Sequence, residues 1–158
     1  MSQPIDPQFI ETFQAAFREG DENVANKLEE AQNVRRVEEV FRLIASKDFK
    51  ALDGILADDV TLEIVGSPDT PMAGLTQGSQ RVIETLENNF AQVEEQQPEI
   101  QSVVAQGDTV VVIGRDRGRF RPTGRNYDLH WMHQYTFKGG KIIRMRELFD
   151  SAALLNVV

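Results

Sequence analysis

Residues 127–149 read YDLHWMHQYTFKGGKIIRMRELF, two runs of alternating character on either side of Gly139-Gly140. In the first run the odd positions are mainly aromatic or apolar, whereas the even positions are mostly polar. Successive side chains of a strand point to opposite faces, so this pattern predicts two half-buried strands over 127–137 and 141–149. The odd positions of both strands are therefore expected to face the protein interior.

The chain before this hairpin shows the same strand pattern back to Pro98 and a helical pattern further upstream. Further strands are predicted over 99–106 and 109–121, and an isolated one over 60–65. Apolar residues recur at helical spacing over 7–20, 28–44 and 78–93, and a short helix is expected after Asp48. Helices followed by an antiparallel meander predict an α+β domain, with helices packed on one face of a curved sheet.

The composition limits the classes of partner. The 158 residues contain 17 Lys and Arg, 25 Asp and Glu and no Cys, for a net charge of −8. That length suits one domain, and the absence of Cys excludes a disulfide or a thiolate metal site. The acidic balance argues against binding to nucleic acid or to anionic membranes. Residues 1–6 lack the basic and apolar character of a signal peptide, so we expect a cytoplasmic protein.

The turns between the last three strands decide which inward residues lie side by side. A two-residue turn at Thr123-Gly124 would place Asp116 opposite Trp131. A three-residue turn at positions 138–140 would place Glu147 opposite the same Trp131. The expected result is a row of Asp116, Trp131 and Glu147 across three strands, with His133 one step along.

Two carboxylates beside an imidazole on an apolar surface can hold a proton donor and a proton acceptor at neutral pH. We therefore assign Glu147 as a candidate base and His133 or Asp116 as a candidate acid. The walls of the expected pocket are Trp131, Tyr135, Met145, Phe120 and Phe149. The structural alternative is that the acids pair with His133, Tyr135 or a backbone N–H and only stabilise the core.

Basic residues gather on the other face of these strands. Arg115, Arg117, Arg119 and Arg121 share one face of their strand, and the register above places Asp128 opposite Arg119. Ion pairing across strands or a dimer interface explains this stripe better than a nucleic-acid track. His130 and His133 lie on opposite faces of one strand, so they cannot share a metal, and we expect neither a metal nor another cofactor.

Three short segments resemble the SnoaL-like group of the nuclear-transport-factor-2-like superfamily. They are Ala57-Asp58-Asp59-Val60, Pro122-Thr123-Gly124-Arg125 and the run from Gly140 to Asp150. The resemblance implies a cone-like α+β barrel, with a curved, mostly antiparallel sheet wrapped around the N-terminal helices and a deep apolar pocket. It covers residues 31–158, which leaves 1–30 as an N-terminal helical extension, and it implies a homodimer packed through the outer sheet face.

The resemblance also compares single positions with known enzymes of the superfamily. Glu147 and Asp116 stand where epoxide hydrolases keep the water-activating and proton-donating acids, but Gly114 replaces the Arg that links those acids. Leu62 and Ile64 replace the Tyr and Asn that hold the water. Relative to ketosteroid isomerases, Ile64 replaces the general base, Val40 the oxyanion-hole Tyr, and His133 the second acid. Leu62, Ile64 and Val40 are therefore expected to line the pocket, and the polyketide cyclases are the nearest functional match.

Two functions follow from these expectations. The first is a cofactor-independent enzyme of the cyclase, isomerase or hydrolase type that acts on a small, largely apolar molecule by acid–base chemistry. The alternative is a non-catalytic ligand-binding or dimerisation module of the same fold.

Overall fold

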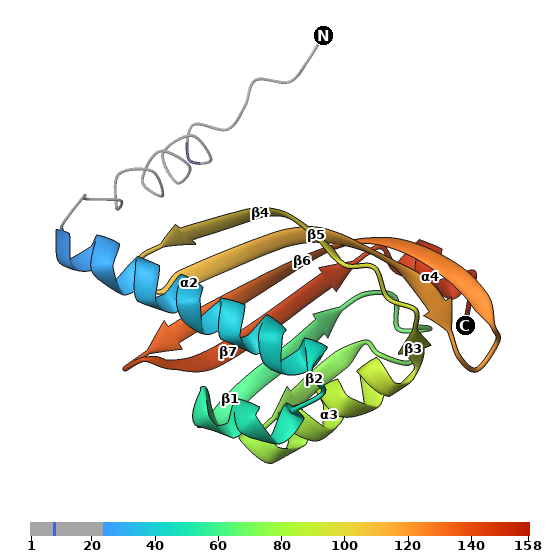
Figure 1. The fold of residues 1–158 in the computed structure, drawn as a ribbon, viewed down its shortest axis with the longest axis horizontal. Helices are drawn as coiled ribbons and strands as arrows, with labels where there is room; N and C mark the ends of the chain where they lie inside the picture. The colour runs from blue at the N-terminus through green and yellow to red at the C-terminus, as the bar shows by residue number, and fades with distance from the viewer. Residues whose placement is uncertain (1–7, 9–23) are drawn as a thin grey trace, which may run out of the picture.

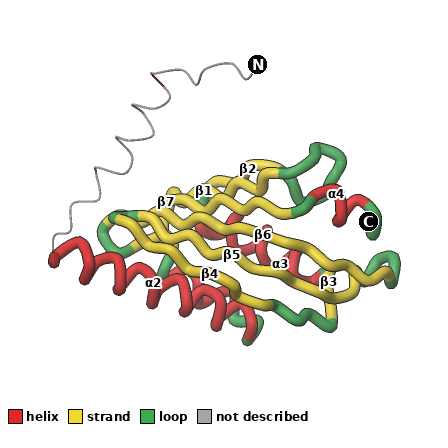
Figure 2. The backbone as a smooth tube through the Cα atoms, turned by 90° about the horizontal axis from the view of Figure 1, so that it is seen from above, coloured by secondary structure: helices red, strands yellow, loops and turns green. Residues whose placement is uncertain are grey.

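The computed structural model describes residues 8 and 24–158 as helices covering one side of a curved sheet (Figures 1 and 2). The helices are α2 (Val24–Ala45), the 3-10 helix η1 (Phe49–Gly54), α3 (Ser79–Ala91) and α4 (Ser151–Leu155). The strands are β1 (Leu56–Val65), β2 (Gly74–Gln77), β3 (Val93–Glu94), β4 (Glu99–Gln106), β5 (Thr109–Phe120), β6 (Arg125–Lys138) and β7 (Lys141–Phe149). The predicted α+β architecture is confirmed.

The helix expected over 7–20 falls almost entirely outside the described residues. The expected boundary between residues 30 and 31 falls inside α2, and that division of the chain stays a prediction. No helix of the described part is long and apolar enough to cross a membrane.

The sheet has the order β2-β1-β7-β6-β5-β3, with β4 paired to β5. Every pairing is antiparallel except that of β1 with β7. The helices α2 and α3 pack on the concave face, and Figure 2 looks down on the opposite face, which they leave uncovered. The main core lies between these helices and the concave face, where Val40, Leu52, Leu62 and Tyr135 are at most 1% exposed.

The predicted register of β5 with β6 is wrong by two residues. Asp116 pairs with Leu129, and Trp131 pairs with Gly114. The connection is a four-residue loop over 121–124, closed by the N–H of Gly124, which donates to the carbonyl of Phe120 at 2.8 Å. The same shift places Asp128 opposite Arg117 rather than Arg119.

The predicted pairing of β6 with β7 is also wrong. Glu147 pairs with His133, and Trp131 pairs with Phe149. Two features cause the shift: Gly139 and Gly140 form a two-residue turn with φ of 58° and 78°, and a bulge interrupts the ladder just before it.

The bulge also changes which residue at the start of β7 faces the core. Ile142 is fully buried there, instead of the expected Ile143. The remaining inward positions of β6 and β7 keep the predicted alternation.

Short elements were missed because they carry no repeating pattern. β2, β3 and α4 contain two to five residues each, too few for a period of 2.0 or 3.6 to show. The strand β1 begins at Leu56, which we expected in the preceding short helix.

Candidate functional site

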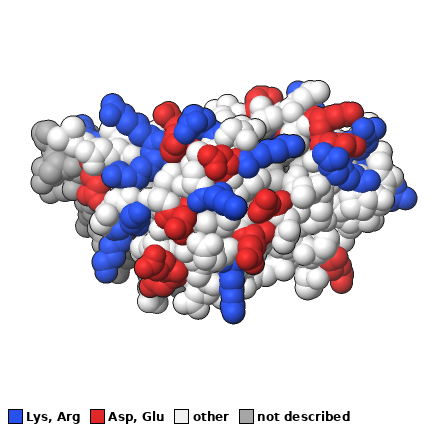
Figure 3. Space-filling model, turned by 60° about the horizontal axis from the view of Figure 1, so that its bottom comes forward, with Lys and Arg blue, Asp and Glu red and all other residues white. Residues whose placement is uncertain are grey.

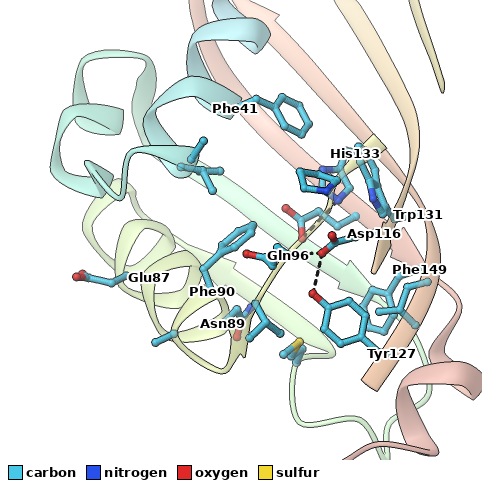
Figure 4. A pocket seen from close by; sticks show the side chains of 18 of the residues that line it. Phe41, Glu87, Asn89, Phe90, Gln96, Asp116, Tyr127, Trp131, His133 and Phe149 are labelled. Carbon is cyan, nitrogen blue, oxygen red and sulfur yellow. Dashed lines mark hydrogen bonds and ion pairs between the residues drawn. The ribbon is translucent and has the colours of Figure 1, made fainter. Parts of the chain in front are cut away.

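A cavity of about 760 Å³ lies between the concave face of the sheet, α2 and α3 (Figure 4). Its size falls within the range of roughly 300–1,000 Å³ typical of small-molecule sites. Of the residues expected at the site, seven line it: Ile64, Asp116, Trp131, His133, Tyr135, Glu147 and Phe149. The two acids, the imidazole and part of the aromatic wall are thus brought together.

Four residues expected to line the pocket lie elsewhere. Val40, Leu62 and Met145 are at most 1% exposed within the main core, where helix and sheet side chains pack against each other. Phe120 belongs to a separate buried cluster near the end of β5. These four residues are part of the core around the cavity and not of its lining.

Four of the lining residues that sequence reasoning missed surround the centre of the site: Phe41, Phe90, Gln96 and Tyr127. Phe41 and Phe90 are on apolar helix faces whose pattern indicated burial but not contact with a cavity. Tyr127 lies on the predicted inner face of β6, and Gln96 comes from the loop after β3, for which the sequence has no signal. Figure 4 shows all four around the same space.

Two glycines of β5 make room for the aromatic wall. A Cβ at Gly114 would come within 2.3 Å of the Trp131 ring, and one at Gly118 within 2.6 Å of the Tyr127 hydroxyl. Each glycine is paired across the strands with the residue that covers it. The space that these glycines leave is therefore filled by aromatic rings, which fixes the positions of Trp131 and Tyr127.

The aromatic wall continues through His133. The ring centroids of Trp131 and His133 are 4.5 Å apart, and Phe41 of α2 stacks against both at 5.9 and 6.1 Å. Stacked rings at these separations contribute beyond the burial of their area. The imidazole is therefore held between sheet and helix with one edge toward Glu147.

Glu147, His133 and Tyr135 form the first polar group of the cavity. The Nε2 of His133 lies 4.0 Å from the Glu147 Oε2, and its Nδ1 lies 3.3 Å from the Tyr135 hydroxyl. The Glu147 and His133 side chains are only 16% and 18% exposed. A separation of 4.0 Å exceeds a hydrogen bond, so a ligand atom or a water can bridge the two groups.

Burial controls the protonation of this group. Burial lowers the pKa of His133 below its ordinary value of 6.5, and the nearby Glu147 carboxylate opposes that shift. Burial also raises the pKa of the Tyr135 hydroxyl well above 10.0, and the charge of Glu147 adds to the effect. At neutral pH the imidazole and the phenol are therefore both uncharged.

Asp116, Tyr127 and Gln96 form the second polar group. The Tyr127 hydroxyl and the Gln96 side-chain amide each donate to the Asp116 Oδ2 at 2.8 Å (Figure 4). Burial, with the hydrogen bond to Asp116, raises the pKa of Tyr127. The other carboxylate oxygen, Oδ1, is buried without a hydrogen-bond partner.

The two groups are separate. Along β6, the partner of Asp116 is Leu129 and the partner of Glu147 is His133, four residues further on. Four residues correspond to roughly 13 Å along a strand. Among the described residues no hydrogen bond or ion pair joins Asp116 to Glu147, and no set of three His, Asp or Glu side chains could hold a metal ion. The expected row of paired acids is therefore not formed.

Three of the four arginines of the expected stripe, Arg115, Arg119 and Arg121, form ion pairs. Arg119 contacts Glu94 and Glu95 at 2.7 and 2.9 Å, and Arg115 pairs with Asp128. Figure 3 shows acidic and basic side chains interspersed also on the helix side of the molecule, opposite the outer sheet face. Ion pairing across strands, as expected, accounts for these arginines.

Comparison with protein families identifies one domain. The model of the SnoaL-like domain matches residues 37–145. No curated protein matches the chain.

Solved structures share the fold over about four fifths of the chain. An NTF2-like protein from Burkholderia xenovorans is 27% identical, with a TM-score of 0.71, over 81% of this chain and 96% of its own. A candidate SnoaL-like polyketide cyclase from Jannaschia is 19% identical, with a TM-score of 0.72, over 82% of this chain and 92% of its own. An LEH-like epoxide hydrolase from Mycobacterium tuberculosis is 22% identical, with a TM-score of 0.65, over 81% of this chain and 90% of its own.

Proposed function

The chain belongs to the SnoaL-like domain family, and from that membership and its cavity we propose that it binds a small, largely apolar molecule and transfers protons on it. The observation that carries this proposal is the position of Glu147, a carboxylate 4.0 Å from His133 in a cavity with Phe41, Trp131 and Tyr135 around that histidine. The cyclase, isomerase and epoxide hydrolase named among structurally similar proteins all fit this type of chemistry.

The roles follow from the geometry of the first polar group. The Glu147 carboxylate has the space on its His133 side to accept a proton from a ligand carbon or from a water. His133, oriented by Tyr135 and by its stacking on Trp131, is placed to donate a hydrogen bond to the oxygen on which charge develops. Exclusion of bulk water by the aromatic wall strengthens both interactions.

The test uses the native protein and Glu147→Gln, which keeps the shape of the side chain but cannot accept a proton. Hydrogen–deuterium exchange at the α-carbon of 4-phenylbutan-2-one in D₂O, followed by NMR, reports proton abstraction whatever the natural substrate is. We expect native protein to accelerate the exchange and Glu147→Gln to lose about a hundredfold or more of that rate. Glu84→Gln is the matched control, because Glu84 is an exposed residue of α3 that does not line the cavity. Exchange of equal rate in native protein and Glu147→Gln would exclude Glu147 as the base.

A second candidate function is ligand binding without turnover. Gly114, covered by the apolar Trp131 ring, provides no charged side chain that would couple the two polar groups. This function predicts that terpenoid epoxides, aromatic polyketides or steroids raise the melting temperature equally in native protein and Glu147→Gln, without accelerated exchange. A ligand present at a hundred times its Kd adds about 2.7 kcal/mol, which a thermal shift detects.

A further inference from the structure

The lining of the cavity has an excess of negative charge. Its acids are Glu87, Glu94, Glu95, Asp116 and Glu147, whereas Lys47 and Arg121 are its only lysine and arginine among the described residues. Arg121 pairs with Glu94 at 3.1 Å, and Arg119 pairs with Glu94 and Glu95 at 2.7 and 2.9 Å. Among the described residues, the negative charge that remains unpaired inside the cavity is therefore that of Asp116 and Glu147. A cavity lined mainly by one sign of charge attracts ligands of the opposite sign.

The two inner acids lack a cationic partner. The described hydrogen bonds of Asp116 come from the neutral groups of Tyr127 and Gln96. The described contact of Glu147 is with His133, which burial keeps neutral at pH 7. Neither carboxylate is bonded to a lysine or arginine in the part of the chain that the structure describes. A carboxylate removed from water is stabilised mainly by a nearby positive charge, so a cation is the complementary group.

The walls suit the same kind of ligand. Trp131 and Phe41 present stacked rings beside Glu147, and Phe90 and Phe149 add aromatic surface to the cavity. The face of an aromatic ring carries negative electrostatic potential, which attracts an ammonium group within about 6 Å. The aromatic faces also bury an apolar body.

We propose that the ligand of this cavity is a protonated amine with an apolar alkyl or aryl body, selected by the unpaired carboxylates and the aromatic faces. The inference rests on the proposed function, because it names the class of molecule that the cavity takes. This charge preference excludes carboxylates and phosphates as ligands, because either would add another negative charge beside Asp116 and Glu147.

Three probes of the same shape test the charge of the ligand: 4-phenylbutylamine, 4-phenylbutan-1-ol and 4-phenylbutyrate. Trp131 is the chain's single tryptophan and lines the cavity, so its fluorescence reports binding directly. We expect the amine to bind about tenfold or more tightly than the alcohol, and the acid to bind more weakly than both. An alcohol that binds as tightly as the amine would overturn the inference but leave the proposed function intact. If none of the three probes bound, both the inference and the proposed function would fail.

The variants Glu147→Gln and Asp116→Asn remove one charge each while keeping side-chain shape. We expect each to reduce the ratio of amine to alcohol affinity, and the double variant to abolish the preference. Glu84→Gln is the control that should keep the native ratio, because Glu84 is exposed and does not line the cavity. A preference that persists in the folded double variant would overturn the inference, because the charge would then come from elsewhere.

Discussion

His133 is the inner of the chain's two histidines, and its environment links folding to pH. Burial lowers its folded-state pKa below 6.5, so the unfolded chain binds more protons than the folded one once the pH falls below that value. The contribution of His133 is therefore fully present above pH 6.5 and is lost progressively as the pH falls toward the folded pKa. We expect the free energy of unfolding to decrease by at most about 1.4 kcal/mol per pH unit from this group. Urea unfolding at a series of pH values measures the slope.

The control for this prediction is the other histidine. His130 is exposed on the opposite face of β6, so His130→Gln should keep the native slope between pH 7 and 5. His133→Gln should flatten it, because glutamine does not titrate. Equal slopes in native protein and His133→Gln would show that other groups cause the pH dependence.

Alternation of residue types predicted the face of each site residue. Asp116, His133 and Glu147 all lie on the inner face of the sheet, as the period of two requires. Their neighbours could not be predicted in the same way, because pairing depends on loop geometry and on bulges. One four-residue loop and one bulge separated Asp116 from Glu147, and the hydrogen bonds of Asp116 with Gln96 and Tyr127 became visible only in three dimensions.

At the scale of the elements, the pair β5–β6 depends on close contact between a glycine and an indole. We expect Gly114→Ala to lower the free energy of unfolding by about 1–3 kcal/mol, because the new Cβ overlaps the Trp131 ring. The Glu99 carbonyl, only 2.6 Å from that Cβ, blocks movement in the other direction. Displacement of the ring should also shift the emission maximum of Trp131, which fluorescence and thermal melting measure together.

Gly54→Ala provides the matched substitution. No atom lies within 4 Å of a Cβ at Gly54, so this variant should leave both the stability and the emission maximum close to native. If Gly114→Ala behaved like Gly54→Ala, the indole would not be held against β5.

The elements themselves were predicted well where their pattern was long. The bounds of β4 and β7 are those expected, β5 ends one residue earlier than expected, and β6 extends by two residues at its start and one at its end. Local sequence fixes such elements because each repeats its period several times. The short helix expected after Asp48 is present as the 3-10 helix η1, whereas the strands β2 and β3 are too short for a period to show and depend on tertiary contacts.

At the scale of the molecule, the outer sheet face carries an apolar row that the helices leave uncovered. Val65, Leu148, Met132 and Ile113 follow one another across four neighbouring strands in register. Val65, Leu148 and Met132 are 40%, 40% and 41% exposed. Ion pairs between Arg146 and Glu63 border the row on one side. An apolar centre with a charged rim is typical of a protein–protein interface.

The resemblance implies a homodimer through this face, and we propose this row as the contact surface. In an interface of two-fold symmetry each copy contributes the same patch, so Met132→Glu would bring two new negative charges into the contact. We expect native protein to elute as a dimer in size-exclusion chromatography with light scattering at micromolar concentration, and Met132→Glu as a monomer. Leu28→Glu, which adds the same charge at a 62% exposed residue of α2, should remain dimeric. An interface at this row would be contradicted if the native protein were a monomer, or if Met132→Glu left the dimer intact. If only Leu28→Glu broke the dimer, the contact would lie at α2 instead.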